Sequence, residues 1–376
     1  MYAFSIMQYL SHTLPALIRG KTALIRVDFN VENQEESFRL RASLPTFKFL
    51  IAANVKIVII SHRGRPRSLR DQKKLSLRSV RLFLERNLGR PVRFISKIGD
   101  DTRRKIDAAA PKSIFLIENL RFDPGEETND PAFAKKLALL GDFFINDAFS
   151  VSHRANASVT GLPGLLPSVA GLLLEKELLG LNDFKKNHDD RLVIILGGAK
   201  ASDKIGVLTH FLARAHRILL GGVPANTFLK ASGFDIGTSI VETSMLPATK
   251  KLLREKNIVL PVDFVWQSGK MFDVGPRTIA AYQKEIADAK TIFWNGPLGY
   301  FERDKFRIGS AAIAKAIVKS EAFSVVGGGE TTQLMHALGL TKRVGFLSTG
   351  GGAMLEYLSG KTLPGLAALE KTKKLR

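Results

Sequence analysis

Polar and basic side chains follow short apolar runs at four places in the first half of the chain. The segments read RVDFN at 26–30, SHRGRP at 61–66, ENLRF at 118–122 and NDAFSVSHR at 146–154. A guanidinium group can bind two oxygens at once, so the set suits a small ligand with several phosphate or carboxylate oxygens. Taken singly, a histidine such as His62 or His153 is explained as well by a structural role, so the prediction rests on the whole set.

Glycines end several apolar runs in the second half: LGGAK at 196–200, LGG at 220–222, NGP at 295–297, VGGGE at 326–330 and STGGGA at 348–353. In an open α/β sheet, ligands bind at the carboxyl ends of strands, where glycine lets the backbone approach phosphate and the next helix offers free N–H groups. Any one glycine pair is explained by a turn that ends a strand. The five together, with lysines beside the first, indicate a nucleotide phosphate site.

Two familiar nucleotide-binding patterns do not account for these glycines. Neither G-x-x-x-x-G-K-[ST] nor G-x-G-x-x-G occurs at the end of an apolar run in this chain. The sequence therefore disfavours a P-loop ATPase and a dehydrogenase.

The elements that must position these residues are strands alternating with helices. Apolar, branched runs occur at 22–29, 56–61, 92–95, 113–120 and 142–149, and again at 191–198, 217–222, 257–266, 291–296, 323–328 and 344–350. This rhythm predicts two doubly wound, parallel-sheet α/β domains with three αβα layers. The leucines and charges of 170–184 predict one helix that joins them. We expect an N-terminal domain at 1–170, a helix and hinge at 171–187, a C-terminal domain at 188–360, and a tail at 361–376 that returns to the N-terminal domain.

The composition limits the kinds of partner. The chain has 376 residues, 45% hydrophobic and 24% charged, which is typical of a globular protein of two or three domains. It has no cysteine, so disulfides, thiolate metal sites and a cysteine nucleophile are excluded. The net charge of +21 predicts anionic partners, and charge alone leaves phosphorylated metabolites, nucleotides, nucleic acid and acidic membranes open. No signal peptide is predicted, because residues 1–20 have no basic region before their apolar part. No membrane span is predicted, because the longest weakly polar stretch, 161–174, is short and contains two prolines.

In their order and spacing these segments resemble the phosphoglycerate kinase family, from about Leu24 to about Leu366. The strings that carry the resemblance include RVDFNV, SHRGRP, ENLRF, GEE, NDAF, HRANAS, GGAK with SDKI, WNGPLGYFE, VVGGG and STGGGAMLE. The resemblance implies reversible phosphoryl transfer between 1,3-bisphosphoglycerate and Mg-ADP, giving 3-phosphoglycerate and ATP in glycolysis and gluconeogenesis. It also implies that the first domain binds the phosphoglycerate and the second binds ADP or ATP with Mg²⁺, in a cytoplasmic monomer.

The resemblance also assigns the phosphoglycerate site. Arg39 is expected to face the transferring group and to be catalytic. Asp28 and Asn30 are expected to hold the hydroxyl and carboxyl end of the substrate. The remaining expected substrate-binding residues are Phe29, His62, Arg63, Gly64, Arg65, Arg121 and Arg154.

For the nucleotide site, the resemblance implies that Lys200 is catalytic and neutralises the transferring phosphoryl group, and that Lys204 reaches the nucleotide phosphates. Glu302 is expected to accept from the ribose hydroxyls, and Glu330 to ligate magnesium. The other expected nucleotide-binding residues are Gly221, Gly222, Pro297, Gly328, Gly329 and Thr331. Such a transfer needs no general base, because the attacking oxygen is already ionised, but it needs positioning, opposing charge and a hinge motion around 170–184.

Several positions depart from the family's usual sequence: Glu32 replaces a proline, and the loop 32–38 lacks the common acidic-glycine pattern. Arg63 replaces a leucine, Val223 a glycine, and Glu330 the aspartate that ligates magnesium. Two other functions stay open at this point: a nucleic-acid-associated protein that keeps the fold as a scaffold, suggested by the net charge, and another α/β kinase or synthetase acting on an acidic metabolite. No aromatic-basic RNA motif or helix-turn-helix is found, so nucleic acid is expected only as a secondary, charge-driven partner.

Overall fold

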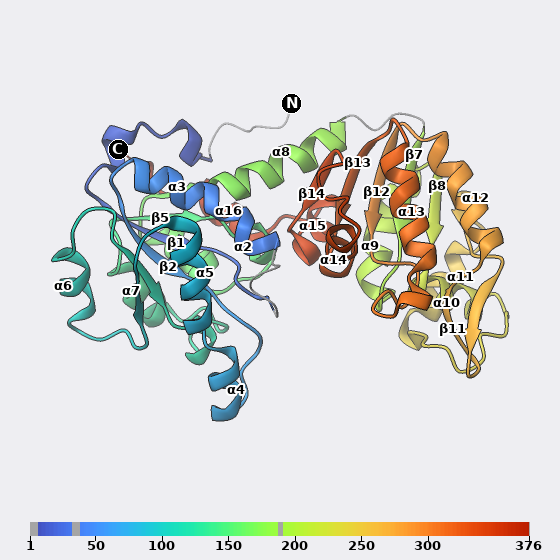
Figure 1. Ribbon diagram of the computed structural model, residues 1–376, viewed down its shortest axis with the longest axis horizontal. Helices are drawn as coiled ribbons and strands as arrows, with labels where there is room; N and C mark the ends of the chain where they lie inside the picture. Colours follow the sequence, from blue (N-terminus) through green and yellow to red (C-terminus); the bar gives the residue numbers. More distant parts are fainter. Residues whose placement is uncertain (1–6, 32–37, 187–190, 376) are drawn as a thin grey trace. The chain divides into compact units, whose positions relative to one another are not determined.

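The structure, a computed structural model, describes residues 7–31, 38–186 and 191–375 and consists of two compact units (Figure 1). Unit 1 comprises Met1–Leu178 and Thr362–Arg376, and unit 2 comprises Leu179–Lys361. The end of the chain therefore belongs to unit 1. In the described residues no helix is long and apolar enough to cross a membrane.

Unit 1 contains a six-stranded sheet in the order β3-β4-β2-β1-β5-β6, with every neighbouring pair parallel. The strands are β1 Thr22–Arg26, β2 Lys56–Ile60, β3 Val92–Ile95, β4 Ile114–Ile117, β5 Phe143–Asn146 and β6 Ser168–Ala170. Its helices are α1 Pro15–Ile18, α2 Phe38–Ala42, α3 Leu44–Ala52, α4 Leu69–Leu75, α5 Arg78–Leu88, α6 Thr102–Asp107, α7 Pro131–Ala138 and α16 Pro364–Glu370.

Alternate residues of these strands enter two separate cores. Ile25 and Ile59 pack in one cluster with residues of α3 and α5, whereas Leu24 and Val58 pack in another with residues of α6 and α7. Successive side chains of a strand point to opposite faces, so the sheet is covered by helices on both sides. This is the predicted three-layer arrangement.

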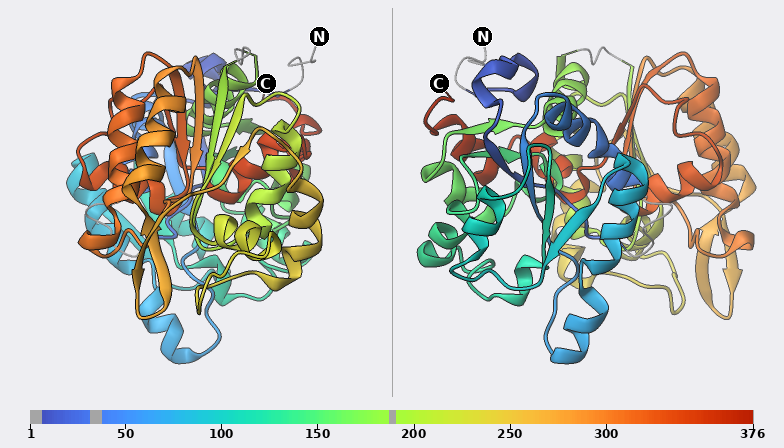
Figure 2. Two further views of the ribbon diagram at one scale, coloured as in Figure 1. Left: turned by 90° about the vertical axis from the view of Figure 1, so that its right-hand side faces the viewer. Right: turned by 60° about the vertical axis from the view of Figure 1, so that its left-hand side comes forward.

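Unit 2 repeats this architecture with a parallel sheet in the order β14-β13-β12-β7-β8-β9 and a separate antiparallel pair, β10 and β11 (Figure 2). The strands are β7 Leu192–Leu196, β8 Arg217–Leu220, β9 Ile258–Val259, β10 Phe264–Gln267, β11 Lys270–Val274, β12 Thr291–Asn295, β13 Phe323–Gly327 and β14 Phe346–Ser348. The helices are α9 Ser202–Phe211, α10 Gly222–Ala231, α11 Leu246–Leu252, α12 Pro276–Ala287, α13 Ile308–Lys319, α14 Gly329–Ala337 and α15 Gly351–Leu358. The two parallel sheets confirm the predicted fold class.

One predicted strand is wrong as written. The apolar run 257–266 forms two short strands, β9 and β10, which belong to different sheets. Pro261 lies between them and has no N–H to donate to a strand ladder, which explains the interruption.

A single helix, α8 (Leu172–Lys186), contains the boundary between the units after Leu178. In unit 1, Asp147 Oδ1 accepts from the backbone N–H of Leu173 at 2.8 Å and fixes the start of the helix. In unit 2, the hydroxyl of Tyr357 donates to Asn182 Oδ1 at 2.7 Å near its end. The expected boundary between 187 and 188 lies outside the described residues.

Candidate active site

Asp28 lies just beyond β1, at the carboxyl edge of the unit 1 sheet. Its Oδ1 accepts from the backbone N–H of Asn30 at 2.9 Å, and its Oδ2 accepts from Arg39 Nη1 at 3.1 Å and from Ser150 Oγ at 2.5 Å. Burial opposes ionisation, but the charge of Arg39 and these hydrogen bonds hold the pKa of Asp28 well below its ordinary value. Asp28 is therefore an ionised carboxylate with donors on both oxygens.

His62, just beyond β2, belongs to a buried network that we call the Arg26 network: Arg26, His62, Glu126 and Ser158. Arg26 donates from Nε to Ser158 Oγ at 2.8 Å and from Nη2 to His62 Nδ1, which lies 3.1 Å away. Ser158 Oγ donates in turn to Glu126 Oε1 at 2.6 Å. Because a guanidinium only donates, Nδ1 of His62 accepts and Nε2 carries the proton. Burial and the charge of Arg26 lower the pKa of His62 well below its usual value, so the ring is neutral.

Arg65, Arg121 and Arg154 form an arginine cluster in unit 1. Arg121 Nη1 donates to the carbonyl of Gly64 at 2.6 Å, and its Nε lies 3.2 Å from Glu127 Oε1. Burial, followed by the charges of Arg154, Arg26 and Arg65, lowers the pKa of Arg121 to about 10, although Glu127 acts in the other direction. Repulsion among these guanidinium groups makes the cluster favourable for a multiply charged anion.

Other predicted substrate-binding residues hold the loops at the carboxyl edge of the unit 1 sheet in place through hydrogen bonds and packing. Asn30 Oδ1 accepts from the N–H of Gly64 at 2.8 Å, and Gly64 has a φ of +59°, which favours glycine. Phe29 is fully buried. The side chain of Arg63 donates to the carbonyl of Val31 at 3.0 Å and to Ser79 Oγ at 3.3 Å. The structure thus gives Arg63 protein partners that hold the loop after β1.

In unit 2, Lys204 projects from α9 toward the ends of β12 and β13. Its Nζ donates to Asn295 Oδ1, and Asn295 Nδ2 donates to the carbonyl of Gly327 at 2.8 Å. The N–H of Gly296 donates to Thr331 Oγ1 at 2.8 Å, so Thr331 ties the start of α14 to the end of β12. These contacts bring two of the predicted glycine-rich segments together, 295–297 and 326–330.

The glycines allow a close approach of these strand ends. Gly328 has a φ of +103°, and a Cβ there would lie 2.8 Å from Asn295 Nδ2. A Cβ on Gly221 would lie 2.4 Å from Leu298 Cδ2. Both positions therefore require glycine, and Gly329 then begins α14 directly beside Glu330.

Lys200 lies on the exposed segment between β7 and α9, close enough to Glu242 for its charge to lower the pKa of that carboxyl group. The larger causes of that lowering are the hydrogen bonds from Ser202. Glu242 accepts from the backbone N–H of Ala201 at 2.7 Å and from that of Ser202 at 3.0 Å. It thereby caps the start of α9, next to Lys200.

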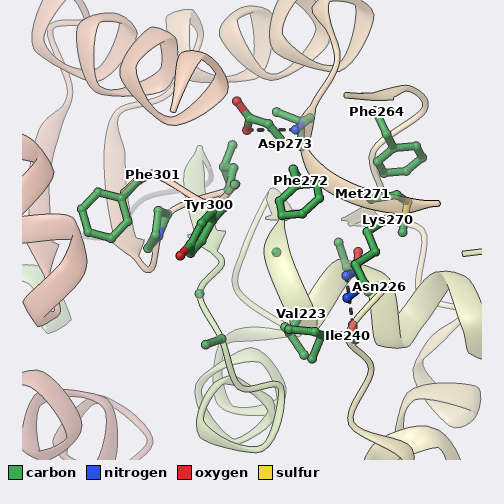
Figure 3. A pocket seen from close by; sticks show the side chains of 18 of the residues that line it. Val223, Asn226, Ile240, Phe264, Lys270, Met271, Phe272, Asp273, Tyr300 and Phe301 are labelled. Carbon is green, nitrogen blue, oxygen red and sulfur yellow. Dashed lines mark hydrogen bonds between the residues drawn. The ribbon is translucent and has the colours of Figure 1, made fainter. Parts of the chain in front are cut away.

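A cavity of about 440 Å³ opens beside these elements in unit 2 (Figure 3). Figure 3 shows aromatic and aliphatic side chains around it, with Val223 and Ile240 at one end and Phe272 and Tyr300 at the other. The predicted residues that line it are Gly222, Pro297, Glu302 and Glu330. An apolar cavity with a few polar groups suits a flat organic ring attached to a charged group.

Comparison with known proteins identifies the family. The protein-family model described as "Phosphoglycerate kinase" matches residues 15–361. The phosphoglycerate kinase of Thermomicrobium roseum is 40% identical over 381 residues, covering 94% of this chain and 97% of that protein. The chain belongs to the phosphoglycerate kinase family.

Solved structures agree with this assignment. Phosphoglycerate kinase from Coxiella burnetii is 36% identical with a TM-score of 0.80, covering 98% of this chain and 100% of that one. Phosphoglycerate kinase from Pyrococcus horikoshii is 32% identical with a TM-score of 0.86, covering 96% and 98%. Phosphoglycerate kinases are phosphotransferases that move a phosphoryl group reversibly between 1,3-bisphosphoglycerate and ADP, a reaction of glycolysis.

The carboxylates Glu302 and Glu330 that line the cavity would fit a Mg²⁺ ion bound together with nucleotide phosphates. Within the described residues there is no group of three or more acidic or histidine side chains that could hold a metal ion. Mg²⁺ is commonly bound through one or two carboxylates together with substrate phosphates and water. Glu330 is a carboxylate that lines the cavity; burial and then Glu302 raise its pKa, while Lys204 lowers it. A cation would favour its ionised form.

Lys204 provides a prediction about the pH dependence of nucleotide binding. Burial lowers the pKa of Lys204 to about 8, against the opposing effect of Asp203 and Glu330. A lysine must be protonated to attract phosphate, so we expect the KM for Mg-ADP to rise as the pH passes upward through about 8. The measurement is KM between pH 6.5 and 9.5, with Lys204→Arg as the control, because a guanidinium keeps its charge. A flat profile for the unaltered protein would contradict this role.

Several residues with close contacts in the site are not singled out from the sequence, among them Arg26, Glu126, Ser150 and Glu242. Arg26 and Glu126 lie inside the strings RVDFNV and GEE, and Ser150 directly follows NDAF. Glu242 lies outside all of these motifs, and no local pattern in the sequence points to it.

Proposed function

We propose that this chain catalyses phosphoryl transfer between 1,3-bisphosphoglycerate and Mg-ADP, with the phosphoglycerate bound in unit 1 and the nucleotide in unit 2. The observation that carries the proposal is the set of charges at the carboxyl edge of unit 1: the ionised Asp28, Arg39 bonded to it, the neutral His62 and the arginine cluster. This set matches a small ligand with a hydroxyl, a carboxyl and a phosphate group.

In unit 1, the arginine cluster binds the non-transferred phosphate of the substrate. His62 donates from Nε2 to a substrate oxygen. Asp28 and Asn30 accept a hydrogen bond from the substrate hydroxyl and orient that end of the substrate. The Arg26 network keeps His62 in its neutral form with the proton on Nε2. Arg39, one quarter exposed, leaves Asp28 and turns toward the transferring group.

In unit 2, the cavity takes the adenine between Gly222, Val223 and Pro297, and Glu302 accepts from the ribose hydroxyls. Lys204 and the N–H groups at the start of α14 bind the nucleotide phosphates. Glu330 would hold Mg²⁺, which when bound neutralises charge on the nucleotide phosphates. Lys200 then faces the transferring phosphoryl group.

The transfer itself requires positioning and opposing charge. The attacking oxygen is ionised in both directions, so no side chain has to remove a proton. Arg39 and Lys200 oppose the negative charge on the transferring group, which is worth most in a site without water. Since the two ligands bind to different units, we propose that α8 acts as the hinge that lets them meet. A cytoplasmic monomer would be sufficient for this chemistry.

A coupled assay tests the proposed function. We expect ATP to be consumed only when 3-phosphoglycerate is present, with 1,3-bisphosphoglycerate captured by a dehydrogenase that oxidises NADH. Filter binding with RNA in the same buffer tests the nucleic-acid alternative suggested by the net charge of +21. RNA binding without kinase activity would overturn the proposal, whereas weak binding that disappears with salt is the secondary interaction expected from charge.

Glu330 provides a prediction about the metal. The extra methylene of glutamate moves its carboxylate outward by about one C–C bond compared with aspartate, whereas Mg²⁺ holds its ligands near 2.0–2.1 Å. We expect Glu330→Asp to lower the Mg²⁺ concentration needed for half-maximal activity and Glu330→Gln to raise it. The exposed Glu321→Gln serves as a control and should leave the titration unchanged. Identical curves for Glu, Asp and Gln at position 330 would show that this side chain does not act on the metal.

A further inference from the structure

Ser150 contacts the substrate-binding carboxylate from a separate part of the chain. It lies in the short 3-10 helix η3 (Phe149–Val151), beyond β5, and its side chain is half-buried. Its hydroxyl donates to Asp28 Oδ2 at 2.5 Å, across 122 residues of sequence. Asp28 Oδ2 therefore has two donors, Ser150 and Arg39.

These two donors have different tasks if the proposed function holds. Arg39 has to leave Asp28 to face the transferring phosphoryl group. Among the described residues, the groups that then still face Asp28 are the hydroxyl of Ser150, the N–H of Asn30, the ring of His62, whose Nδ1 is 4.0 Å away, and, without a hydrogen bond, the charge of Arg26. His62 is neutral and accepts at Nδ1 from Arg26, so it does not replace the lost cation. Ser150 is left as the side-chain donor on Oδ2.

We propose that Ser150 is a positioning residue of the phosphoglycerate site, whose hydroxyl holds the Asp28 carboxylate in place while Arg39 moves to the transferring group. The proposal rests on the proposed function. A buried carboxylate that loses a donor is costly, so without Ser150 the Asp28 side chain would rotate away from the substrate or retain Arg39. Both effects would lower kcat/KM for phosphoglycerate, and neither would change the binding of the nucleotide.

The first test is the kinetics of Ser150→Ala. We expect kcat/KM for 3-phosphoglycerate to fall by about tenfold, the effect of one hydrogen bond to a charged group, with the KM for Mg-ATP unchanged. Ser150→Thr keeps the hydroxyl and should retain most of the activity. Ser152→Ala is the matched control, because Ser152 Oγ donates only weakly, at 3.3 Å, to the carbonyl of Ala148. Equal losses for both substrates, or no rescue by threonine, would overturn the proposal.

The second test asks whether Ser150 acts through Asp28. Calorimetric titration with 3-phosphoglycerate should show that Ser150→Ala raises Kd by about threefold or more in the unaltered protein but has almost no effect on a protein that carries Asp28→Asn. A merely structural role would give the same factor in both backgrounds and would refute the inference. If the unaltered protein has no kinase activity, the proposed function itself fails. If it is active and Ser150→Ala matches it in every measurement, this inference alone fails.

Discussion

Replacing Arg39 with alanine is expected to reduce kcat by about a hundredfold or more, the cost of removing a charge that acts mainly on the transition state, about 3 kcal/mol. The KM for 3-phosphoglycerate should change much less. The reason lies in the geometry: Arg39 is bonded to Asp28 at 3.1 Å in the described state and is one quarter exposed, so it can exchange Asp28 for the transferring group. Steady-state kinetics with varied concentrations of 3-phosphoglycerate and ATP measure both kcat and KM.

The same helix supplies a control for Arg39. Arg41 also lies in α2 and places its guanidinium 5.9 Å from the centre of the Phe83 ring. Arg41→Ala removes the same charge from the same helix and should keep most of the activity. If Arg39→Ala raises KM as much as it lowers kcat, Arg39 only binds the substrate.

Replacing Glu126 with leucine is expected to lower the free energy of unfolding of unit 1 by about 3–5 kcal/mol and its melting temperature by about 10 °C. Arg26 is 1% exposed and Glu126 is also 1% exposed, with Arg26 Nη2 at 3.9 Å from Glu126 Oε1. The substitution leaves the buried guanidinium without its carboxylate and removes the acceptor of Ser158 Oγ and N–H. An uncompensated buried charge explains the size of the effect.

The double variant Arg26→Met/Glu126→Leu separates stability from function. It removes both charges together, so most of the stability should return. Activity should stay low, because His62 loses the donor that fixes its tautomer. The two tryptophans, Trp266 and Trp294, lie in unit 2, so circular dichroism is needed beside fluorescence to follow unit 1. Full recovery of activity in the double variant would show that the Arg26 network has no part in positioning His62.

Local patterns were sufficient for most strands but not for the contacts within the site. The runs around Ala23 and Ile59 are apolar throughout because both faces of these strands are buried, and such runs are visible in sequence. The run 257–266 is equally apolar, yet Pro261 and the switch to another sheet divide it, which depends on tertiary pairing.

The site residues also differ in this respect: motifs in the sequence predict some of their roles, whereas tertiary structure determines their contacts. The resemblance predicted the roles of Arg39, His62 and Lys204, and these roles remain proposals. The pairs Ser150 with Asp28 and Arg26 with Ser158 are separated by 122 and 132 residues, and no local spacing encodes them. Arg63 shows the converse: it stands in a binding motif, but its side chain bonds to Val31 and Ser79.

The central claim is that unit 1 binds the phosphoglycerate and unit 2 the nucleotide. The most direct measurement is a crystal structure with 3-phosphoglycerate and a non-hydrolysable ATP analogue. We expect 3-phosphoglycerate oxygens within hydrogen-bond distance of Arg121, Arg154 and His62, and the adenine in the cavity of unit 2. A phosphoglycerate bound in unit 2, or an unoccupied arginine cluster at saturating ligand, would contradict this account.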